Sequence, residues 1–373
     1  MRVLLLHDPY RPIEIGSVGG EDNLAQLEID TLTTLGIDVI DGREFDHGFS
    51  RKVNQLRAQS IGSHKSVLEL IRATKPDVVH THNLSQRSGY AWMHETEIPI
   101  VSSIHNYRLF CPSSIAWRAG SPCTLCLDGS ALNAIRHRCD GLRGGINASR
   151  HLIFQRDYPQ IEKPRLFLMS SNLMANLFEK VITASKMRIL RNPSFISESL
   201  TNNKREGWIF AGRFVEEKGV LELVNNWPDN EKLDLAGDGP LRGKLEDLIK
   251  DKSNINLIGT YPPGENSIFS NYEGMFFTST WFEGSPLVIV DCLGAGTPVI
   301  CTSGSGAREQ IDITQAGTVI SKGLSPESIK ASQNLIRRDF KRFQENAISA
   351  IQNQLSISTW GTNLAQYLGE AVN

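Results

Sequence analysis

The sequence predicts an α/β fold of two Rossmann-like domains that face each other across a cleft. With 373 residues, the chain is long for one domain and comfortable for two, each large enough to bury its own core. In both halves short apolar runs alternate with longer helical stretches, the pattern of parallel sheets wrapped by helices. A polar, turn-rich segment at residues 191–204 separates the halves, so we expect the domain boundary near residue 193.

The first predicted domain covers residues 1–193. It opens with a buried strand at residues 3–6, followed by a loop with Gly19, Gly20 and Glu21. Leucines at roughly helical spacing come next and predict a helix that ends at Gly36. Further strands are expected at residues 37–40, 77–80, 100–103 and 167–170.

The same alternation restarts in the second predicted domain, residues 194–355. Its strands are expected at residues 208–212, 232–237, 255–259, 274–279 and 298–302. A last helix within residues 356–373 should begin after a capping Ser358 or Thr359. We expect this helix to cross back to the first domain.

The composition and charge fit an enzyme of the cytoplasm. The net charge is -2, but Lys and Arg outnumber Asp and Glu by four over residues 1–193, which leaves -6 for the remainder. The basic half is therefore the expected face for an anionic partner. The apolar start at residues 1–6 is too short for a signal segment, and no window approaches about eighteen apolar residues. Peripheral attachment to the inner face of a membrane stays open.

The stretch from Trp281 to Pro298 carries the clearest chemical signal. An apolar strand is followed by Glu283, by the turn Gly284-Ser285-Pro286 and then by an expected helix. Asp291 lies inside this helix. The free N–H groups at such a helix start favour phosphate. A phosphate site with two nearby carboxylates suits a sugar nucleotide.

Several separated motifs resemble, in order, those of retaining glycosyltransferases of the GT-B fold. The resemblance is to the family-4 type of bacterial polysaccharide and cell-envelope glycan assembly, and it covers nearly the whole chain. The motifs are Gly19-Gly20-Glu21, Asp77 to Asn83, His105-Asn106, Gly212 to Gly219, Gly237 to Pro240, and Glu283 through Asp291 to Pro298. The resemblance implies a hexosyltransferase with a nucleoside diphosphate sugar as donor.

The resemblance assigns donor binding mainly to the second domain. Arg213 and Lys218 would bind the diphosphate and neutralise the charge that it gains as the glycosidic bond breaks. The alternative is that both are solvated charges paired with Glu216 and Glu217. The expected donor-binding residues are Gly19, Gly20, Arg213, Lys218, Glu283, Gly284, Ser285, Pro286, Leu287 and Asp291.

The two carboxylates have different implied tasks. Glu283 would lie near the sugar hydroxyls, and Asp291 would accept hydrogen bonds from both ribose hydroxyls. Asp291 stands where the family usually has Glu, so its shorter side chain makes the ribose contact closer, water-bridged or weaker. Its alternative role is a plain acid on the helix surface.

Histidines supply the candidates in the first domain. His105 follows the strand at residues 100–103, and the resemblance implies that it contacts the donor sugar or steadies the transition state. Asn106 stands where an acid is frequent, so no acid accompanies His105 in this motif. We expect the strand to end between His80 and His82, with one packing and one facing the cleft. The catalytic candidates are His105, Glu283, Arg213 and Lys218.

The implied mechanism retains the anomeric configuration. Two carboxylates could achieve this in principle, as in glycosidases. The resemblance implies instead a same-face displacement in which the departing phosphate helps to deprotonate the acceptor. No metal or cofactor is needed at the reaction centre.

Four cysteines lie within a predicted insert at residues 110–141. Cys111, Cys123, Cys126 and Cys139 have the spacing C-x11-C-x2-C-x12-C, which is typical of a structural zinc site in a reducing compartment. The alternative is four unconnected, reduced thiols. A basic stretch from Arg136 to Arg156 follows, interleaved with apolar residues; it is either a membrane-surface contact for a lipid-linked acceptor or a solvated face.

Other classes of protein fit less well. A nucleic-acid-binding protein built round the cysteines is disfavoured because the chain is acidic overall. A dinucleotide oxidoreductase is disfavoured because Gly237-Asp-Gly239-Pro240 lacks the third glycine of that fingerprint. An epimerase or phosphorylase of similar fold stays open. We expect a nucleotide-sugar donor and a glycan or lipid-linked acceptor as partners, and no nucleic acid.

Overall fold

The chain divides into two compact units. The computed structural model describes residues 1–7, 20–42, 65–83, 91–130, 132–139, 162–194, 204–261, 266–304, 306–321 and 323–373. Unit 1 consists of Met1–Ala116, Cys123–Leu190 and Gly361–Asn373, and unit 2 of Trp117–Pro122 and Arg191–Trp360. The main division thus falls between Leu190 and Arg191, beside the hinge expected near residue 193.

Unit 1 contains a six-stranded parallel sheet with the order β2-β1-β3-β4-β7-β8. The order reverses between β1 and β3, because β1 pairs with β2 on one side and with β3 on the other. The expected strands all form, and β8 is an addition. The strands are β1 (Arg2–Leu6), β2 (Asp38–Asp41), β3 (Val78–His82), β4 (Ile100–Ile104), β7 (Leu166–Met169) and β8 (Met187–Ile189).

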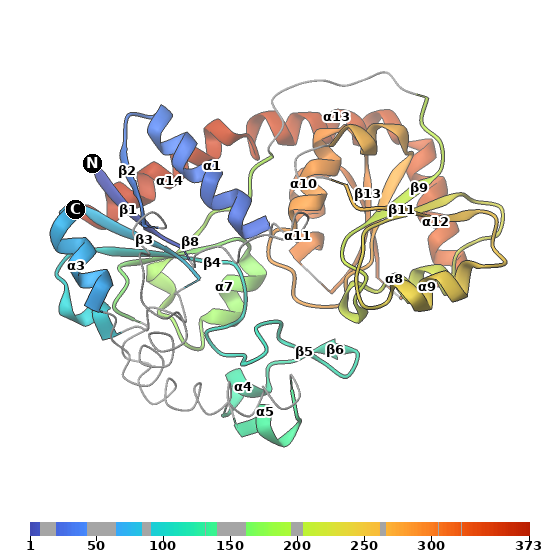
Figure 1. The fold of residues 1–373 in the computed structure, drawn as a ribbon. Helices are drawn as coiled ribbons and strands as arrows, with labels where there is room; N and C mark the ends of the chain where they lie inside the picture. The colour runs from blue at the N-terminus through green and yellow to red at the C-terminus, as the bar shows by residue number, and fades with distance from the viewer. Residues whose placement is uncertain are drawn as a thin grey trace. The chain divides into compact units, whose positions relative to one another are not determined.

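Helices cover the sheet of unit 1, with α1 and α14 on one side and α7 on the other (Figure 1). The bounds are α1 (Gly20–Thr34), α3 (Lys65–Thr74), α4 (Leu125–Asp128), α5 (Leu132–Arg136), α7 (Asn172–Phe178), α14 (Ile357–Val372), and the 3₁₀ helices η2 (Ala91–Glu95) and η4 (Ala184–Lys186). The last helix begins two residues earlier than expected. The Ser356 hydroxyl caps it by accepting a hydrogen bond from the Thr359 amide at 3.1 Å. Gly361 of α14 packs so closely on Thr31 of α1 that a Cβ would lie 2.3 Å from its methyl group.

Unit 2 contains a second six-stranded parallel sheet, in the order β11-β10-β9-β12-β13-β14. The order reverses between β9 and β12. The five expected strands form, and β14 is an addition. The strands are β9 (Trp208–Ala211), β10 (Leu233–Ala236), β11 (Ile255–Gly259), β12 (Gly274–Phe277), β13 (Val299–Thr302) and β14 (Gly317–Ile320).

Alternating side chains of these strands build a core on each face of the second sheet. Ile209 of β9 packs with α10, α11 and α13, whereas its neighbours Trp208 and Phe210 pack with α8, α9 and α12. The helices are η5 (Glu216–Lys218), α8 (Val220–Asn225), α9 (Arg242–Ile249), η6 (Asn266–Asn271), α10 (Leu287–Gly294), α11 (Gly306–Thr314), α12 (Pro326–Arg338) and α13 (Phe340–Asn353). Figure 1 shows α8 and α9 apart from α10 and α11. The predicted α/β class with parallel sheets is confirmed.

The predicted insert is partly described. It holds a short hairpin of β5 (Trp117–Arg118) and β6 (Ser121–Pro122), which clusters with unit 2, and the short helices α4 and α5. Most of the basic stretch, including Arg143, Arg150 and Arg156, lies outside the described residues. Among the helices that the structure describes, none combines the length and apolar character needed to span a bilayer.

Candidate functional site

Each sheet places candidate residues at the point where its strand order reverses. In a parallel sheet, the loops at the carboxyl ends of the two strands flanking this point separate and leave room for a ligand. In unit 2 the flanking strands are β9 and β12, followed by the loops that carry Lys218 and Glu283. In unit 1 they are β1, which is followed directly by His7, and β3, which ends at His82.

Lys218 is held by a tightly packed loop. The next residue, Gly219, has a left-handed φ of +68°, and a Cβ there would lie 2.3 Å from the Thr278 carbonyl oxygen. The Thr278 hydroxyl donates to the Lys218 carbonyl at 2.9 Å, and the Thr280 amide donates to the Glu217 carbonyl at 2.8 Å. These contacts join the loop after β9 to the loop after β12, so the side chains of both loops are brought together.

Lys218 and Glu283 form a direct ion pair between these loops. The Ser279 hydroxyl also donates to Oε1 of Glu283, at 2.9 Å. The Lys218 ammonium lies 5.5 Å from the centre of the Phe277 ring and 5.6 Å from that of Trp281. Glu283 is buried and Lys218 half-buried, so the pair is a partly desolvated charge centre at one edge of the sheet. The alternative pairing of Lys218 with Glu216 or Glu217 is wrong.

The segment after Glu283 is fixed by α11 and by the start of unit 2. The Gly306 amide donates to the Glu283 carbonyl at 2.9 Å, and a Cβ at Gly306 would lie 2.2 Å from that oxygen. The Ser285 hydroxyl accepts from Gln310 at 3.0 Å and from the Asn192 amide at 3.2 Å. Pro286, the N-cap of α10, has no side chain that could cap the amides of Leu287 and the residues after it. Glu283 therefore lies on a rigid turn, beside an uncapped helix start.

Arg213 lies on the same loop as Lys218 and is exposed. It forms no ion pair with any residue in the described part of the chain. Nearby glycines are tightly packed, since a Cβ at Gly237 would lie 2.0 Å from the Gly212 carbonyl and one at Gly239 would lie 2.7 Å from that of Phe214. The glycines of the predicted motifs therefore allow the loops after β9 and β10 to touch.

Asp291 is buried, with 3% of its surface exposed. It lies within α10 and close to Tyr261, whose pKa is raised by burial and also by the charge of Asp291. The alternative of a plain acid on the helix surface is wrong. A buried carboxylate is stable only with hydrogen-bonding or charged groups around it, so Asp291 is not a solvated surface acid.

The two histidines of β3 lie on one face of the strand and are both buried, with 0% and 1% exposed. The expectation that the strand ends between His80 and His82 is wrong, because β3 continues through His82. Residues two apart in a strand point the same way. Both side chains are packed within unit 1, so the expectation that only one of the two histidines packs is wrong as well.

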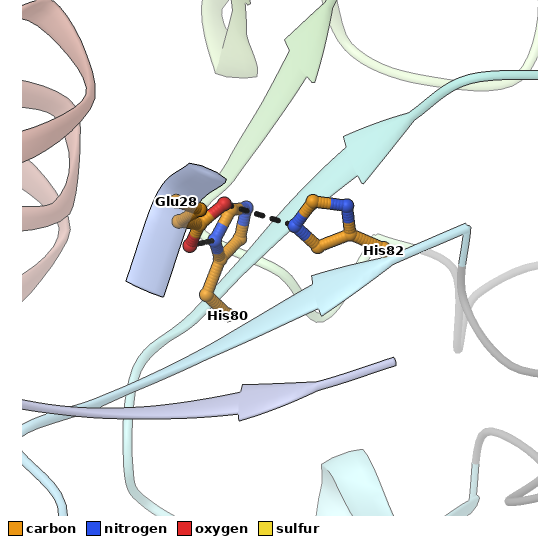
Figure 2. Close-up of side chains that lie close together, drawn as sticks. All are labelled: Glu28, His80 and His82. Atoms are coloured by element: carbon orange, nitrogen blue, oxygen red, sulfur yellow. Dashed lines mark hydrogen bonds and ion pairs between the residues drawn. The ribbon is translucent and has the colours of Figure 1, made fainter. Parts of the chain in front are cut away.

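Glu28 of α1 joins these histidines into one hydrogen-bonded chain (Figure 2). Its Oε1 lies 2.5 Å from Nδ1 of His80 and its Oε2 lies 2.9 Å from Nε2 of His82. The chain continues on one side from His80 Nε2 to the Ser103 hydroxyl at 2.9 Å. On the other side it continues from His82 Nδ1 to His105 Nε2 at 3.0 Å.

The charges in this chain differ from those of the free side chains. Burial works to raise the pKa of Glu28, but attraction to His80 and His82 and their hydrogen bonds outweigh burial and lower it to about 2. Burial lowers the pKa of His82 below its usual value. Burial, with the neighbouring histidines, lowers that of His105 well below 6.5. Near neutral pH, Glu28 is ionised while His82 and His105 are neutral.

These charges fix the position of each proton. A carboxylate only accepts, so His82 must donate from Nε2, and a neutral imidazole carries only one N–H. Nδ1 of His82 is therefore an acceptor, and Nε2 of His105 must be the donor to it. Neutral His105 is left with its unprotonated nitrogen at Nδ1. Glu28 thus selects the tautomer of His105 through His82.

The backbone of His105 is fixed by Asn83, which follows β3. The Asn83 side chain accepts from the His105 amide at 2.7 Å. Asn106 accepts from the Arg108 amide at 3.0 Å and so stabilises the next turn. Although no acid follows His105 in sequence, Glu28 supplies a carboxylate two hydrogen bonds away. Its signal in the sequence is an acid at helical spacing between Leu24 and Leu32, on the buried stripe of α1.

Glu28, His80 and His82 are also the one described group of three whose potential metal-binding atoms all lie within 4.8 Å of one another. Both oxygens and all four ring nitrogens of the group already have hydrogen-bond partners. The side chains of the group are buried, whereas a catalytic metal site keeps a position open to water or substrate. These contacts favour a proton-ordered chain over a metal centre.

The other predicted site residues belong to unit 1. Gly19 is outside the described residues, and Gly20 is the first residue of α1. The four clustered cysteines all belong to unit 1. The two other cysteines, Cys292 and Cys301, are buried in the core of unit 2.

Unit 2 matches a known protein family, and parts of the chain match two known proteins. Residues 192–352 match the family described as "Glycosyl transferases group 1". The chain is 31% identical over 101 residues to TuaC of Bacillus subtilis, provisionally named a teichuronic acid biosynthesis glycosyltransferase; the match covers 26% of this chain and 25% of TuaC. It is 24% identical over 269 residues to an uncharacterized glycosyltransferase of Methanocaldococcus jannaschii, covering 65% of this chain and 60% of that protein. The matches thus span less than two thirds of either relative.

Solved structures resemble the whole chain in fold. HepE of Anabaena, solved with UDP, has a TM-score of 0.61 at 15% identity, covering 99% of this chain and all of that one. Sucrose-phosphate synthase of Thermosynechococcus elongatus has a TM-score of 0.66 at 14% identity, covering 99% of each chain. WaaG, a glycosyltransferase of lipopolysaccharide biosynthesis, has a TM-score of 0.62 at 14% identity, also covering 99% of each. Residues 192–352 thus resemble a group 1 glycosyl transferase domain, and the chain has the GT-B fold.

Proposed function

We propose that this protein transfers a hexose from a nucleoside diphosphate sugar to a glycan or a lipid-linked oligosaccharide, with retention of the anomeric configuration. The observation that carries the proposal is the contact of Lys218 with Glu283. The two residues come from the loops after β9 and β12, at the strand-order reversal of the domain that matches a glycosyl transferase family. Ligands of such folds bind at this position.

Lys218 and Arg213 are the proposed binders of the diphosphate. When the bond between the sugar C1 and the phosphate oxygen breaks, its electron pair stays on the phosphate, and the new negative charge needs positive partners. Lys218 is compensated by Glu283 before the donor arrives, whereas exposed Arg213 is available for the phosphates. The uncapped start of α10 adds backbone amides for the same charge.

Glu283 is the proposed anchor of the donor sugar. Once the diphosphate attracts Lys218, the carboxylate of Glu283 becomes an acceptor for sugar hydroxyls. Gly284, Ser285, Pro286 and Leu287 would line the phosphates and sugar with backbone groups. Buried Asp291 would accept the ribose hydroxyls, at a distance that its short side chain must bridge.

His105 is the proposed contact of unit 1 with the reacting sugar. Its Nδ1 is an acceptor for a hydroxyl proton, and its ring is held by His82 and Asn83. Glu28 cannot act as a nucleophile, because both of its oxygens are bound to histidines. This supports direct displacement: the acceptor oxygen bonds to C1 on the face that the phosphate leaves, and its proton goes to the phosphate.

The finer features of the proposal rest on the similar proteins. HepE was solved with UDP and, in another structure, with UDP-glucose, which makes UDP-glucose the first donor to test. TuaC and WaaG are named for envelope glycans, so oligosaccharides of that kind are the first acceptors to test. Lipid-linked acceptors would require contact with a membrane surface.

Transfer from a panel of nucleotide sugars tests the proposal. Lys218→Ala and Glu283→Ala should each lower the rate of transfer by about a hundredfold or more, because each removes a partner of the donor. Lys244→Ala, an exposed lysine of α9, is the matched control and should retain the full rate.

Transfer within about twofold of wild type in both site variants would contradict the proposed site. Product analysis separates the alternative. An epimerase would convert the sugar nucleotide without consuming acceptor, whereas the proposed enzyme releases a nucleoside diphosphate and lengthens the acceptor.

A further inference from the structure

Two short helices of the insert after β4 expose apolar side chains, whereas its four cysteines are buried or half-buried. In α4 and α5, Leu125, Leu132 and Ile135 are 39%, 55% and 42% exposed. The buried cluster of the same segment consists of Cys126 and Ala134, with Cys139 packed against it. Two small side chains bury little apolar surface, so the part of the insert around α4 and α5 needs another source of stability.

All four cysteines gather around this small cluster. Cys126 lies in α4, and Cys139 follows α5, where its amide bonds to the Ala134 carbonyl at 3.0 Å. Cys123 returns the chain from the β5–β6 hairpin, with its amide bonded to the Ala116 carbonyl at 2.7 Å. The thiol of Cys126 interacts electrostatically with those of Cys111, Cys123 and Cys139, which places the three other sulfurs in its vicinity.

The backbone of the insert is strained around the cysteines. Seven described residues other than glycine have a positive φ, and four of them are in this segment: Ser114, Ala116, Ala119 and Arg138. Such conformations cost about 1 kcal/mol or more each and persist only where the surroundings hold them. A bond network centred on the four sulfurs would help to hold these turns in place.

We propose that Cys111, Cys123, Cys126 and Cys139 bind one structural zinc ion that staples the insert of unit 1. Four thiolates make a closed tetrahedral site, and the pair Cys123 and Cys126 has the two-residue spacing of a zinc knuckle. Zinc bonds of about 2.3 Å place sulfurs about 3.8 Å apart. No three of the four sulfurs, all of them described, lie within 4.8 Å of one another, so zinc binding draws them closer.

Binding releases the thiol protons. Each sulfur gives up a proton to solvent as it bonds to zinc, so no oxidant is involved and the ion keeps its charge. A pair of disulfides would instead need an oxidant. All six cysteines lie in the described part of the chain, and none of them forms a disulfide there.

Metal analysis of the full-length protein, expressed with added zinc and purified without chelator, tests the site. We expect about one zinc per chain. Cys123→Ser and Cys126→Ser should each lower the zinc content by about tenfold or more. The control Cys301→Ala removes a buried thiol of unit 2 and should keep the zinc.

If the serine variants fail to fold, measurements on the wild-type protein still test the site. Replacement of zinc by cobalt(II) in the wild type should give the absorption of a tetrahedral thiolate site, and removal of zinc by a chelator should lower the melting temperature. Wild-type protein with less than about a tenth of a zinc per chain would overturn the proposal. So would zinc retained in both serine variants, iron with sulfide, or four thiols lost to disulfides.

Discussion

Unit 1 and unit 2 use the same feature of a parallel sheet in opposite ways. In both, polar side chains gather where the strand order reverses. In unit 2 they form a single ion pair, Lys218 with Glu283, whose partners come from loops and keep some contact with solvent. In unit 1 they form a linear chain of hydrogen bonds that runs from Ser103 through His80, Glu28 and His82 to His105. Strands and a helix carry most of these residues.

The ion pair of unit 2 can exchange its partners for a ligand, whereas the buried chain of unit 1 keeps its partners. A half-buried ion pair can be replaced by a phosphate and a sugar hydroxyl at small cost. A fully buried carboxylate held by two histidines cannot lose either partner without leaving a charge uncompensated. We infer that unit 2 changes its contacts when the donor binds, whereas unit 1 presents a fixed histidine.

The largest expected effect contrasts the two carboxylates. Glu28→Ala leaves two buried N–H groups without an acceptor and should lower the free energy of unfolding by about 3 to 5 kcal/mol. Glu283→Ala leaves Lys218 able to reach water and should cost less than about 1 kcal/mol, although transfer is lost. Denaturant unfolding measures both, with Glu69→Ala on the exposed face of α3 as control. An equal loss of free energy of unfolding in Glu28→Ala and Glu283→Ala would contradict the proposed difference between the two units.

A smaller effect is expected from crowding the turn that carries Glu283. Gly306→Ala places a methyl group 2.1 Å from the Gly284 carbonyl and 2.2 Å from that of Glu283, so this turn must shift. We expect a loss of about 2 kcal/mol in stability and of about tenfold or more in transfer. Gly304→Ala is the matched control, because a Cβ there meets nothing within 4 Å. If both variants behave alike, the turn is not rigid.

A gradual effect, spread over the acid range, is a pH dependence that comes from unit 1. The folded-state pKa values of His82 and His105 are lowered, so the unfolded chain takes up protons below about pH 6.5 while the folded chain does not. The stability is therefore full above this pH and falls with acidification, by at most about 1.4 kcal/mol per pH unit for each histidine. Glu28 adds a further loss from about pH 4.5 downward, toward its pKa of about 2.

Denaturant unfolding between about pH 7 and about pH 5 checks this dependence. His105→Gln should flatten the slope, whereas His94→Gln, an exposed histidine of η2, should leave it unchanged. An unaltered slope in His105→Gln would show that His105 takes up its proton freely in the folded protein.

The alternation of strands and helices could be predicted from the sequence because buried parallel strands are apolar throughout. Two edge strands were missed, since Met187-Arg-Ile and Gly317-Thr-Val-Ile are short and partly polar. The pairing of Lys218 with Glu283 joins residues 65 positions apart, which no local pattern shows. The motif resemblance supplied both residues but not their contact.

The chain through Glu28 could not be predicted for a related reason. An acid on an apolar helical stripe is a recognisable signal, but its partners lie more than fifty positions away in β3. The direction of His80 and His82 depended on where β3 ends, and strand ends are poorly fixed by local sequence. Tertiary contact, rather than local preference, decides both features.

Binding of nucleoside diphosphates tests the central claim most directly, because it isolates the diphosphate from the sugar and the acceptor. Calorimetric titration of UDP, GDP and ADP into the wild type should identify at least one that binds. Lys218→Ala should raise the Kd of that ligand by about tenfold or more, a loss of about 1.4 kcal/mol, and Lys244→Ala should leave it unchanged. An unchanged Kd in Lys218→Ala, or no binding by the wild type, would contradict the account.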